Sequence, residues 1–271
     1  MKELFRPKKP LVMGILNTTP DSFSDGGNYV RKDIALRRIE SMIHEEVDII
    51  DVGGESTRPG AQAVSVNEEL DRVIPMVEAV VASGKPVSVD TSKAQVMQEA
   101  IKAGASMIND VRALQEDGAL DVVAADKDIL VCLMHMQGQP RTMQQNPQYH
   151  NVVDDVKTFL KKRLEICQEA GINADRICLD PGFGFGKTLQ HNCELMKHLN
   201  SLKELNLPLL VGVSRKTMIG TILDAEVNAR TNGSVVAAMY ALTKGASILR
   251  VHDVKPTVEA VKLFCAFEQV E

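Results

Sequence analysis

Tryptophan is missing from the 271-residue chain, and all aromatic residues together make up only 4% of it. No apolar run comes near the roughly 18 residues that a membrane-spanning helix requires. The net charge of -5 leaves no basic excess of the kind that nucleic-acid-binding domains carry. We therefore expect neither a membrane nor a nucleic acid as a partner. An anionic ligand would be bound by a few local cations and helix N-termini.

Cysteines are few and show no pairing pattern. The chain has five, an odd number without a C-x-x-C motif, and they are Cys132, Cys167, Cys178, Cys193 and Cys265. Reduced thiols and a cytoplasmic location are therefore expected. The start of the chain is basic and then apolar, but it lacks the small-residue cleavage pattern of a signal peptide. We interpret residues 11–16 as the first strand.

Apolar runs that stop at a polar or charged residue recur along the chain. There are eight, at residues 11–16, 49–50, 86–89, 107–108, 129–133, 177–179, 209–213 and 248–249. Each interval has room for one helix, which is the rhythm of parallel βαβ units. The pattern predicts an α/β protein, a single (β/α)8 TIM barrel over residues 1–271, with its site at the C-terminal ends of the strands.

Helices are expected between these runs. The predicted ranges are 34–46, 68–82, 95–103, about 119–125, 152–170, 189–202, 235–244 and 258–268. Asp33 and Asn67 are expected to cap the first two. The loops at 17–32 and 53–66 are unusually long, contain glycine and lie on the predicted site side, so they are candidate lids.

Acceptor side chains gather at the predicted strand ends. Asp51, Asp90 and Asp180 end three strands, and Asn109 ends a fourth. Carboxylates accept hydrogen bonds only, whereas an amide both donates and accepts. Together they suit the edge of a heterocycle that bears amino and ring N–H groups. The alternative is that each Asp caps the following helix, and several on one rim favour the ligand-binding interpretation.

Cations gather after the last two strands. Arg215 and Lys216 follow the seventh, and Arg250 and His252 lie two residues apart in the eighth. Barrels commonly bind phosphate at these loops, so this group predicts a clamp for a diphosphate. Asn17 follows the neighbouring first strand, and its amide oxygen suits a Mg²⁺ ion on the diphosphate. Arg215 and Lys216 as solvated loop charges are the alternative.

Two local motifs are weaker. The segment 180–188 contains Gly-Lys-Thr but lacks the first glycine of a P-loop, so we interpret it as a tight loop that brings Phe183 or Phe185 to the site. Packing between barrel and helices is the alternative for both rings. Met134 and His135 show no metal-site spacing, and an apolar wall is the expected role of Met134.

Eight motifs closely resemble the signatures of dihydropteroate synthases. They occupy residues 14–27, 51–60, 88–91, 108–110, 134–138, 180–187, 212–216 and 250–253, and so extend over nearly the whole chain. The one departure is Thr18, where an apolar residue is more usual. The resemblance implies a folate-biosynthesis transferase that joins 6-hydroxymethyl-7,8-dihydropterin diphosphate to 4-aminobenzoate, and a homodimer.

The resemblance also implies roles for individual residues. The expected pterin-binding residues are Asp90, Asn109, Met134, Asp180, Phe183, Gly212 and Lys216. The diphosphate would be held by Asn17, Arg58, Arg250 and His252, with Mg²⁺ at Asn17. The 4-aminobenzoate would be enclosed by Phe23, Thr57, Pro59, Phe185 and Ser214. Asp51, Asp90, Arg250 and His252 are the expected catalytic residues of a dissociative mechanism.

Three other interpretations stay open. A pterin-binding methyltransferase would share the barrel and the carboxylates but would not need the diphosphate clamp. A pterin or folate binding module would bind the ligand without releasing diphosphate. An unrelated phosphate-binding barrel would share only the cations near the chain end.

Overall fold

Eight parallel strands form the centre of the computed structural model, which describes residues 2–5, 9–18, 28–56, 63–138 and 142–268. The strands are β1 (Leu11–Asn17), β2 (Ile49–Gly53), β3 (Val87–Asp90), β4 (Met107–Asp110), β5 (Leu130–Met134), β6 (Ile177–Asp180), β7 (Leu210–Val211) and β8 (Ile248–Val251). Their order is β6-β5-β4-β3-β2-β1-β8-β7, and a parallel bridge between Leu179 and Leu209 brings the two outermost strands together. The predicted TIM barrel is confirmed.

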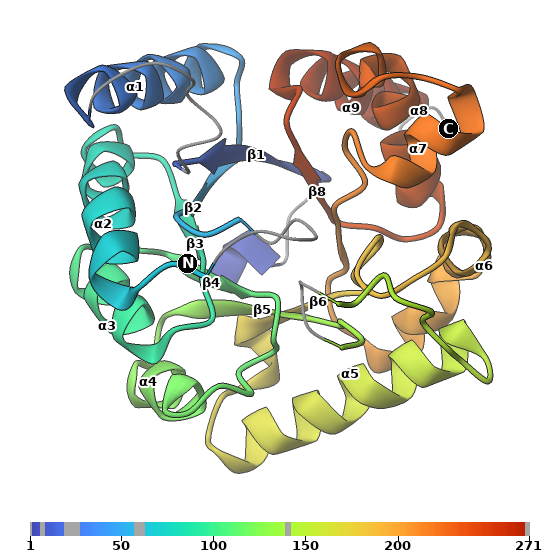
Figure 1. Cartoon of the computed structure of the whole chain (residues 1–271), viewed down its shortest axis with the longest axis horizontal. Helices are drawn as coiled ribbons and strands as arrows, with labels where there is room; N and C mark the ends of the chain where they lie inside the picture. Colours follow the sequence, from blue (N-terminus) through green and yellow to red (C-terminus); the bar gives the residue numbers. More distant parts are fainter. Residues whose placement is uncertain (1, 6–8, 19–27, 57–62, 139–141, 269–271) are drawn as a thin grey trace.

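Helices surround this barrel (Figure 1). They are α1 (Asn28–His44), α2 (Val66–Ala82), α3 (Ala94–Lys102), α4 (Ala119–Ala125), α5 (Val152–Glu169), α6 (Leu189–Lys197), α7 (Thr217–Leu223), α8 (Thr231–Thr243) and α9 (Val254–Glu268). Short 3-10 turns are η1 (Lys2–Phe5), η3 (Ala174–Arg176), η4 (Leu199–Leu205) and η5 (Val227–Ala229). Within the described ranges, every helix is too short or too polar to cross a membrane.

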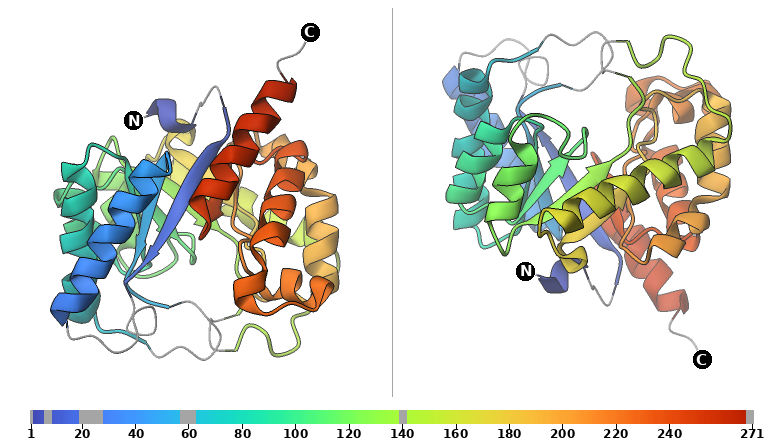
Figure 2. Two further views of the ribbon diagram at one scale, coloured as in Figure 1. Left: turned by 90° about the horizontal axis from the view of Figure 1, so that it is seen from above. Right: turned by 90° about the horizontal axis from the view of Figure 1, so that it is seen from below.

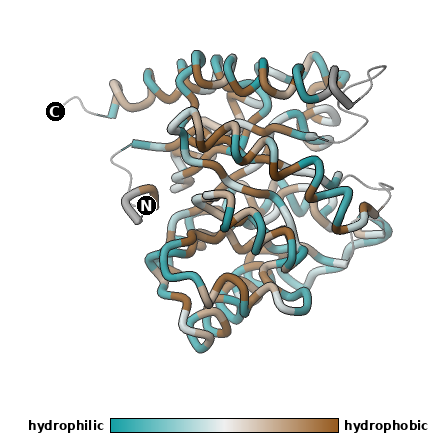
Figure 3. Tube along the Cα trace, turned by 90° about the vertical axis from the view of Figure 1, so that its left-hand side faces the viewer, coloured by the Kyte–Doolittle hydropathy of each residue, from teal (hydrophilic) through white to brown (hydrophobic). Residues whose placement is uncertain are grey.

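The barrel strands serve two apolar cores because alternate side chains point to opposite faces. In β1, Val12 and Leu16 belong to the larger core between strands and helices, whereas Leu11 and Met13 belong to the core inside the barrel. Hydropathy alternates along the surrounding helices, as expected for helices with one face on the barrel (Figure 3). The inner core therefore fills one end of the barrel and leaves the other for polar side chains.

Phe5 of η1 belongs to the inner core and is 5% exposed. Figure 2 shows η1 and the last turns of α9 at one end of the barrel, while β1 runs toward the opposite end. The N-terminal ends of the strands are thus covered by η1. This leaves the C-terminal strand ends as the polar mouth, where barrels bind ligands.

Both predicted helix caps are wrong. Asp33 lies exposed inside α1, because that helix begins at Asn28 and no proline or glycine interrupts it before Asp33. Ser65 caps α2 in place of Asn67, and its side chain accepts from the backbone of Glu68 while the Glu68 side chain accepts in return. This capping box satisfies two N-terminal donors at once, which a cap at Asn67 would not do.

One strand and two helices have boundaries that differ from the predicted ones for local reasons. The predicted seventh strand, 209–213, shortens to Leu210–Val211 between Pro208 and Gly212. The predicted helix at 189–202 divides into α6 and η4 at His198. The last helix begins at Val254 rather than residue 258, since a proline in the first helical turn loses no hydrogen bond.

Candidate functional site

Neighbouring strand ends bring the predicted polar residues together. The strand register pairs Gly53 with both Asn17 and Asp90, and it pairs Asp90 with Asn109. A methyl group built on Gly53 would lie 3.7 Å from Asn17 Oδ1 and 3.6 Å from Asp90 Cβ. Gly53 therefore lies in contact distance of both an amide on β1 and a carboxylate on β3.

Arg250 joins two carboxylates at this mouth. Its Nε donates to Asp51 Oδ2 at 2.6 Å, and its Nη2 donates to Asp90 Oδ2 at 2.7 Å. Asn109 Nδ2 also donates to Asp51 Oδ2, at 3.3 Å. Asp51 lies within β2 rather than at its end and is fully buried. A buried carboxylate needs such partners, because desolvation penalises its charged form.

The two carboxylates share one cation, which leaves the group short of positive charge. Burial raises the pKa of Asp90 to about 7, and the neighbouring Asp51 adds to the rise while Arg250 opposes it. Asp51 Oδ1 is buried and has no hydrogen-bond partner in the described structure. This corner of the mouth is therefore ready to accept further hydrogen bonds or a positive charge from a ligand.

Asp180 and Lys216 form the opposite side of the mouth. Asp180 pairs in register with Met134 and accepts from the Gly182 backbone N–H at 2.7 Å. Lys216 extends inward, where its Nζ donates to the Phe183 carbonyl at 2.5 Å. Burial raises the pKa of Asp180 and lowers the pKa of Lys216 to about 8, and each charge opposes the shift of the other. Lys216 is thus a half-buried donor beside a buried acceptor.

The two phenylalanines of the β6–α6 loop have different surroundings. The Phe183 side chain is fully buried in the larger core, so packing is the role that the structure shows for its ring. The half-buried Phe185 ring lies with its centroid 4.7 Å from Lys216 Nζ. Phe185 therefore borders the mouth, and the contribution of Phe183 there is its carbonyl oxygen.

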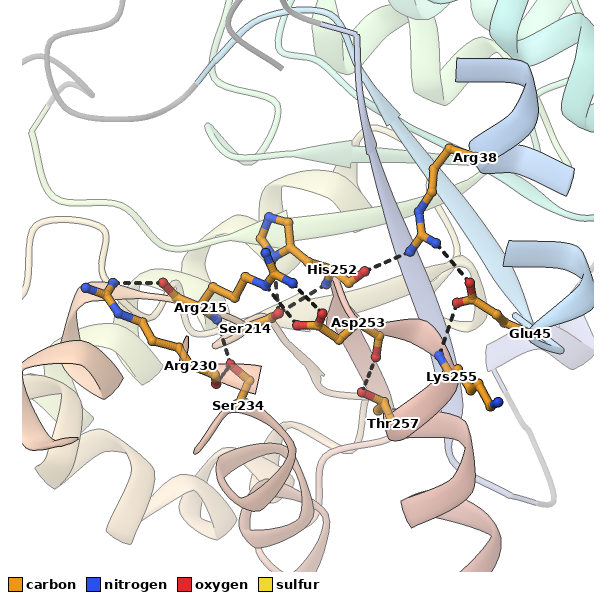
Figure 4. A network of polar contacts seen from close by, with 10 residues as sticks. All are labelled: Arg38, Glu45, Ser214, Arg215, Arg230, Ser234, His252, Asp253, Lys255 and Thr257. Atoms are coloured by element: carbon orange, nitrogen blue, oxygen red, sulfur yellow. Dashed lines mark hydrogen bonds and ion pairs between the residues drawn. The ribbon is translucent and has the colours of Figure 1, made fainter. Parts of the chain in front are cut away.

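Ser214 and His252 are linked beside this mouth (Figure 4). Ser214 Oγ accepts from the His252 backbone N–H at 3.1 Å and lies 3.1 Å from His252 Nδ1. Arg215 donates through Nε and Nη2 to both oxygens of Asp253, at 2.9 and 2.5 Å. Its backbone N–H also donates to Ser234 Oγ. Arg215 is not a freely solvated loop charge, because it fastens the loop after β7 to the residue that follows His252.

A second arginine holds the other side of His252. Arg38 of α1 donates to the His252 carbonyl at 2.8 Å and to Glu45 at 3.0 Å. Glu45 also accepts from the Lys255 backbone N–H at 3.1 Å, at the start of α9 (Figure 4). The position of His252 is therefore set from β7, α1 and α9 together, which its place in the sequence did not indicate.

Two buried residues near the site were not predicted from the sequence. Lys187 is 3% exposed, and its Nζ lies 2.9 Å from His135 Nδ1. Burial lowers the pKa of Lys187 to about 7 and that of His135 to about 3. The only sequence signal was the position of Lys187 at the end of a glycine-rich loop, which does not distinguish a buried lysine from a solvated one.

Four predicted ligand contacts cannot be placed. Phe23, Thr57, Arg58 and Pro59 lie outside the described residues, as do residues 19–27 of the first predicted lid and 57–62 of the second. Gly212 is described, and a methyl group there would lie 3.6 Å from Arg250 Cβ. In the described part of the chain, no three His, Cys, Asp or Glu side chains are grouped to hold a metal. The mouth is thus the C-terminal face of a barrel built for a small polar ligand.

Comparison with known proteins agrees with a barrel that binds a small polar ligand. Residues 13–252 match the family described as pterin binding enzyme. A dihydropteroate synthase of Haemophilus influenzae is 53% identical over 258 residues, which cover 95% of this chain and 94% of that protein. The chain therefore belongs to the dihydropteroate synthase family of pterin-binding barrel enzymes.

Solved structures of the family superpose closely. The dihydropteroate synthase of Yersinia pestis, in a complex with a sulfonamide drug, has a TM-score of 0.92 at 51% identity and covers 97% of this chain and 95% of its own. The Xanthomonas albilineans synthase with 4-aminobenzoic acid has a TM-score of 0.92 at 48% identity, with the same coverage of 97% and 95%. The predicted enzyme class, a transferase, is confirmed by these relatives.

Proposed function

We propose that this transferase joins 6-hydroxymethyl-7,8-dihydropterin diphosphate to 4-aminobenzoate and releases diphosphate. The observation that carries the proposal is the buried group of Asp51, Asp90 and Arg250 at the barrel mouth. It places acceptors for a cationic heterocycle beside a donor for its anionic leaving group. The chain's similarity to dihydropteroate synthases supports the same reaction.

The pterin binds between the two sides of the mouth. Asp180 and Asn109 accept the amino and ring N–H groups of the pterin edge, and Lys216 donates to a ring acceptor. Donor and acceptor are already neighbours, since Asp180 and Lys216 perturb the pKa of each other. Met134 and Gly212 border the ring faces. Since a buried site built for hydrogen bonds strongly disfavours ligands that lack them, this edge sets the specificity.

The diphosphate binds to Arg250, His252 and Asn17, with Arg58 as a further cation. The Arg250 side chain extends from β8 to Asp51 and Asp90. It therefore contacts both the reacting centre and the leaving group. Asn17 would hold Mg²⁺ through its amide oxygen, since this ion prefers oxygen ligands. When bound, Mg²⁺ supplies positive charge that neutralises the departing diphosphate.

The 4-aminobenzoate binds against Phe185 and Ser214, with Phe23, Thr57 and Pro59 as further contacts. The X. albilineans structure with 4-aminobenzoic acid supports a site for this molecule in the family. The complex of the Y. pestis enzyme with a sulfonamide drug supports competition at this site. We expect a sulfonamide to inhibit this chain competitively with 4-aminobenzoate.

The reaction is dissociative. The bond from the pterin methylene carbon to the diphosphate oxygen breaks first, and the oxygen keeps the electron pair. Asp90 and Asp51 stabilise the resulting pterin cation, while Arg250 and His252 stabilise the charge on the diphosphate. The amine nitrogen of 4-aminobenzoate then bonds to the methylene carbon and releases a proton. The weak nucleophilicity of an arylamine favours this order.

The test is diphosphate release from the pterin diphosphate with Mg²⁺, with and without 4-aminobenzoate. Release that depends on 4-aminobenzoate, with 7,8-dihydropteroate as product, supports the proposal. Tight pterin binding without release favours a binding module or a methyltransferase. For the mechanism, a pterin cation predicts a marked secondary isotope effect when the methylene hydrogens are replaced by deuterium. A value near unity contradicts early departure of diphosphate.

We also propose a homodimer through α7, α8 and α9. Large apolar side chains are exposed there, among them Leu223 at 51%, Val236 at 69% and Phe267 at 73%. Extended exposed apolar surface of this kind marks association sites. Sedimentation should give twice the chain mass for the wild type, and Val236→Glu should yield monomers. A wild-type monomer at micromolar concentration contradicts the proposal. The cytoplasmic location stays a prediction.

A further inference from the structure

The loop between β6 and α6 is built by close backbone contact with the loop after β5. Gly182 has a φ of +69°, and a methyl group there would lie 1.8 Å from the His135 carbonyl oxygen. Gly186 has a φ of +64°, and a methyl group there would lie 2.5 Å from the Gln137 carbonyl oxygen. Tyr149 Oη also donates to the Gly186 carbonyl at 2.8 Å. The loop conformation thus depends on groups that tie the two backbones together.

Lys187 provides the central tie. Its Nζ donates to the carbonyls of Gly182 and Phe185 at 2.9 and 3.1 Å, and the third contact is His135 Nδ1 at 2.9 Å. An ammonium group has three donors, and each of these three acceptors takes one. A neutral His135 ring supplies the third acceptor when its proton is on Nε2. In the ammonium form of Lys187 all three donors are therefore used within the protein, which leaves none for a ligand.

The segment that Lys187 holds carries three contacts of the mouth. The Gly182 N–H donates to Asp180, the Phe183 carbonyl accepts from Lys216, and the Phe185 ring lies against the same lysine. All three belong to residues 182–185, and Lys187 binds the first and the last carbonyl of this segment. A displacement of this segment would move the acceptor for the pterin edge and the ring beside 4-aminobenzoate together.

We propose that Lys187 is a positioning residue, whose buried ammonium sets the geometry of Asp180 and Lys216 for the pterin without touching it. His135 assists by presenting Nδ1 as an acceptor. The proposal rests on the proposed function, because it assumes that a pterin binds at Asp180. If Lys187 only stabilised the fold, its loss would weaken the binding of both ligands. As a positioning residue, it should affect binding of the pterin at the β6 side of the mouth and leave diphosphate binding unchanged. Arg250 and His252 are held by other partners.

The main variant is Lys187→Met, which keeps length and removes the charge. We expect the Kd for 6-hydroxymethylpterin to rise about tenfold or more, since loss of a well-placed buried hydrogen bond costs on the order of tenfold in affinity. The Kd for inorganic diphosphate with Mg²⁺ should change less than about twofold. Lys197→Met, an exposed change on the adjacent α6, is the control and should match the wild type in both assays. If folded Lys187→Met binds both ligands more weakly by the same factor, or binds both as tightly as the wild type does, the proposal is overturned.

A second pair of variants decides the question if Lys187→Met does not fold. His135→Asn keeps an acceptor oxygen near the Nδ1 position, whereas His135→Phe removes it. We expect pterin affinity to fall about fivefold more for the Phe variant than for the Asn variant, with diphosphate affinity equal in both. Equal pterin affinity in the two variants overturns the proposal. Failure of the wild type itself to bind pterin would instead overturn the proposed function.

Discussion

Asp90→Asn should make the protein lose less stability than the wild type as the pH rises, while it impairs the reaction. Burial raises the pKa of Asp90 from 3.8 to about 7, so the folded protein holds this proton more tightly than the unfolded chain does. The stability from the protonated group is present below pH 3.8 and is lost as the pH rises to about 7. At about 1.4 kcal/mol per pH unit, about 3 kcal/mol of that loss falls between pH 5 and pH 8.

The asparagine variant lacks this titration but keeps an oxygen that accepts from Arg250. Its free energy of unfolding, relative to the wild type, should therefore rise by about 3 kcal/mol from pH 5 to pH 8. Urea unfolding at several pH values measures this difference. Asp71→Asn, an exposed change on α2, is the control and should show no such rise.

Two results would refute the reasoning. If the unfolding free energies of Asp90→Asn and the wild type ran parallel between pH 5 and pH 8 within about 1 kcal/mol, the pKa of Asp90 would not be raised on folding. If the variant kept full turnover at pH 8, the carboxylate would not stabilise the pterin cation. We expect turnover to fall on the order of a hundredfold, as for the loss of other preorganised electrostatic groups.

Three further changes test the local structure. Ser65→Ala should lower the free energy of unfolding by about 1 kcal/mol, whereas Asn67→Ala should change it by less than about 0.5 kcal/mol; equal costs would contradict the capping box. Gly182→Ala should cost more than about 3 kcal/mol because of its backbone clash, against about 1 kcal/mol for Gly171→Ala, where the space is open. Arg215→Met should cost about 1 kcal/mol through loss of a half-exposed bidentate ion pair, and a neutral result in urea unfolding would contradict that.

The fold was predictable from the sequence because buried parallel strands leave a signal that depends on residue type alone. Runs such as 129–133 and 177–179 are apolar on both faces and stop where the strand reaches the mouth. Helix starts were less predictable, since Asp33 and Asn67 have the right chemistry for a cap without the backbone conformation. The S-x-x-E pattern at Ser65 was the stronger local signal, because it satisfies two donors rather than one.

The site was predictable in its residue types but not in its partnerships. Asp51, Asp90 and Arg250 could be assigned to one rim from strand order, yet the arginine was expected to face a diphosphate. In the structure it is held by two carboxylates, and that pairing needs the registers of β8 with β1, β1 with β2 and β2 with β3. Sequence spacing gives no account of contacts between residues 160 to 199 positions apart.

Lys187 is a second residue whose partners could not be predicted from the sequence. A lysine after a glycine-rich loop is usually solvated, because burial of an ammonium without partners is costly. Here the partners are two carbonyls of its own loop and one imidazole from the loop after β5, so the cost is offset by the turn that the glycines create. The glycines allow the loop to close on the lysine, and the lysine keeps it closed. A buried cation can therefore belong to the architecture of an anion-binding site without contacting the anion, and residue type alone does not separate the two roles.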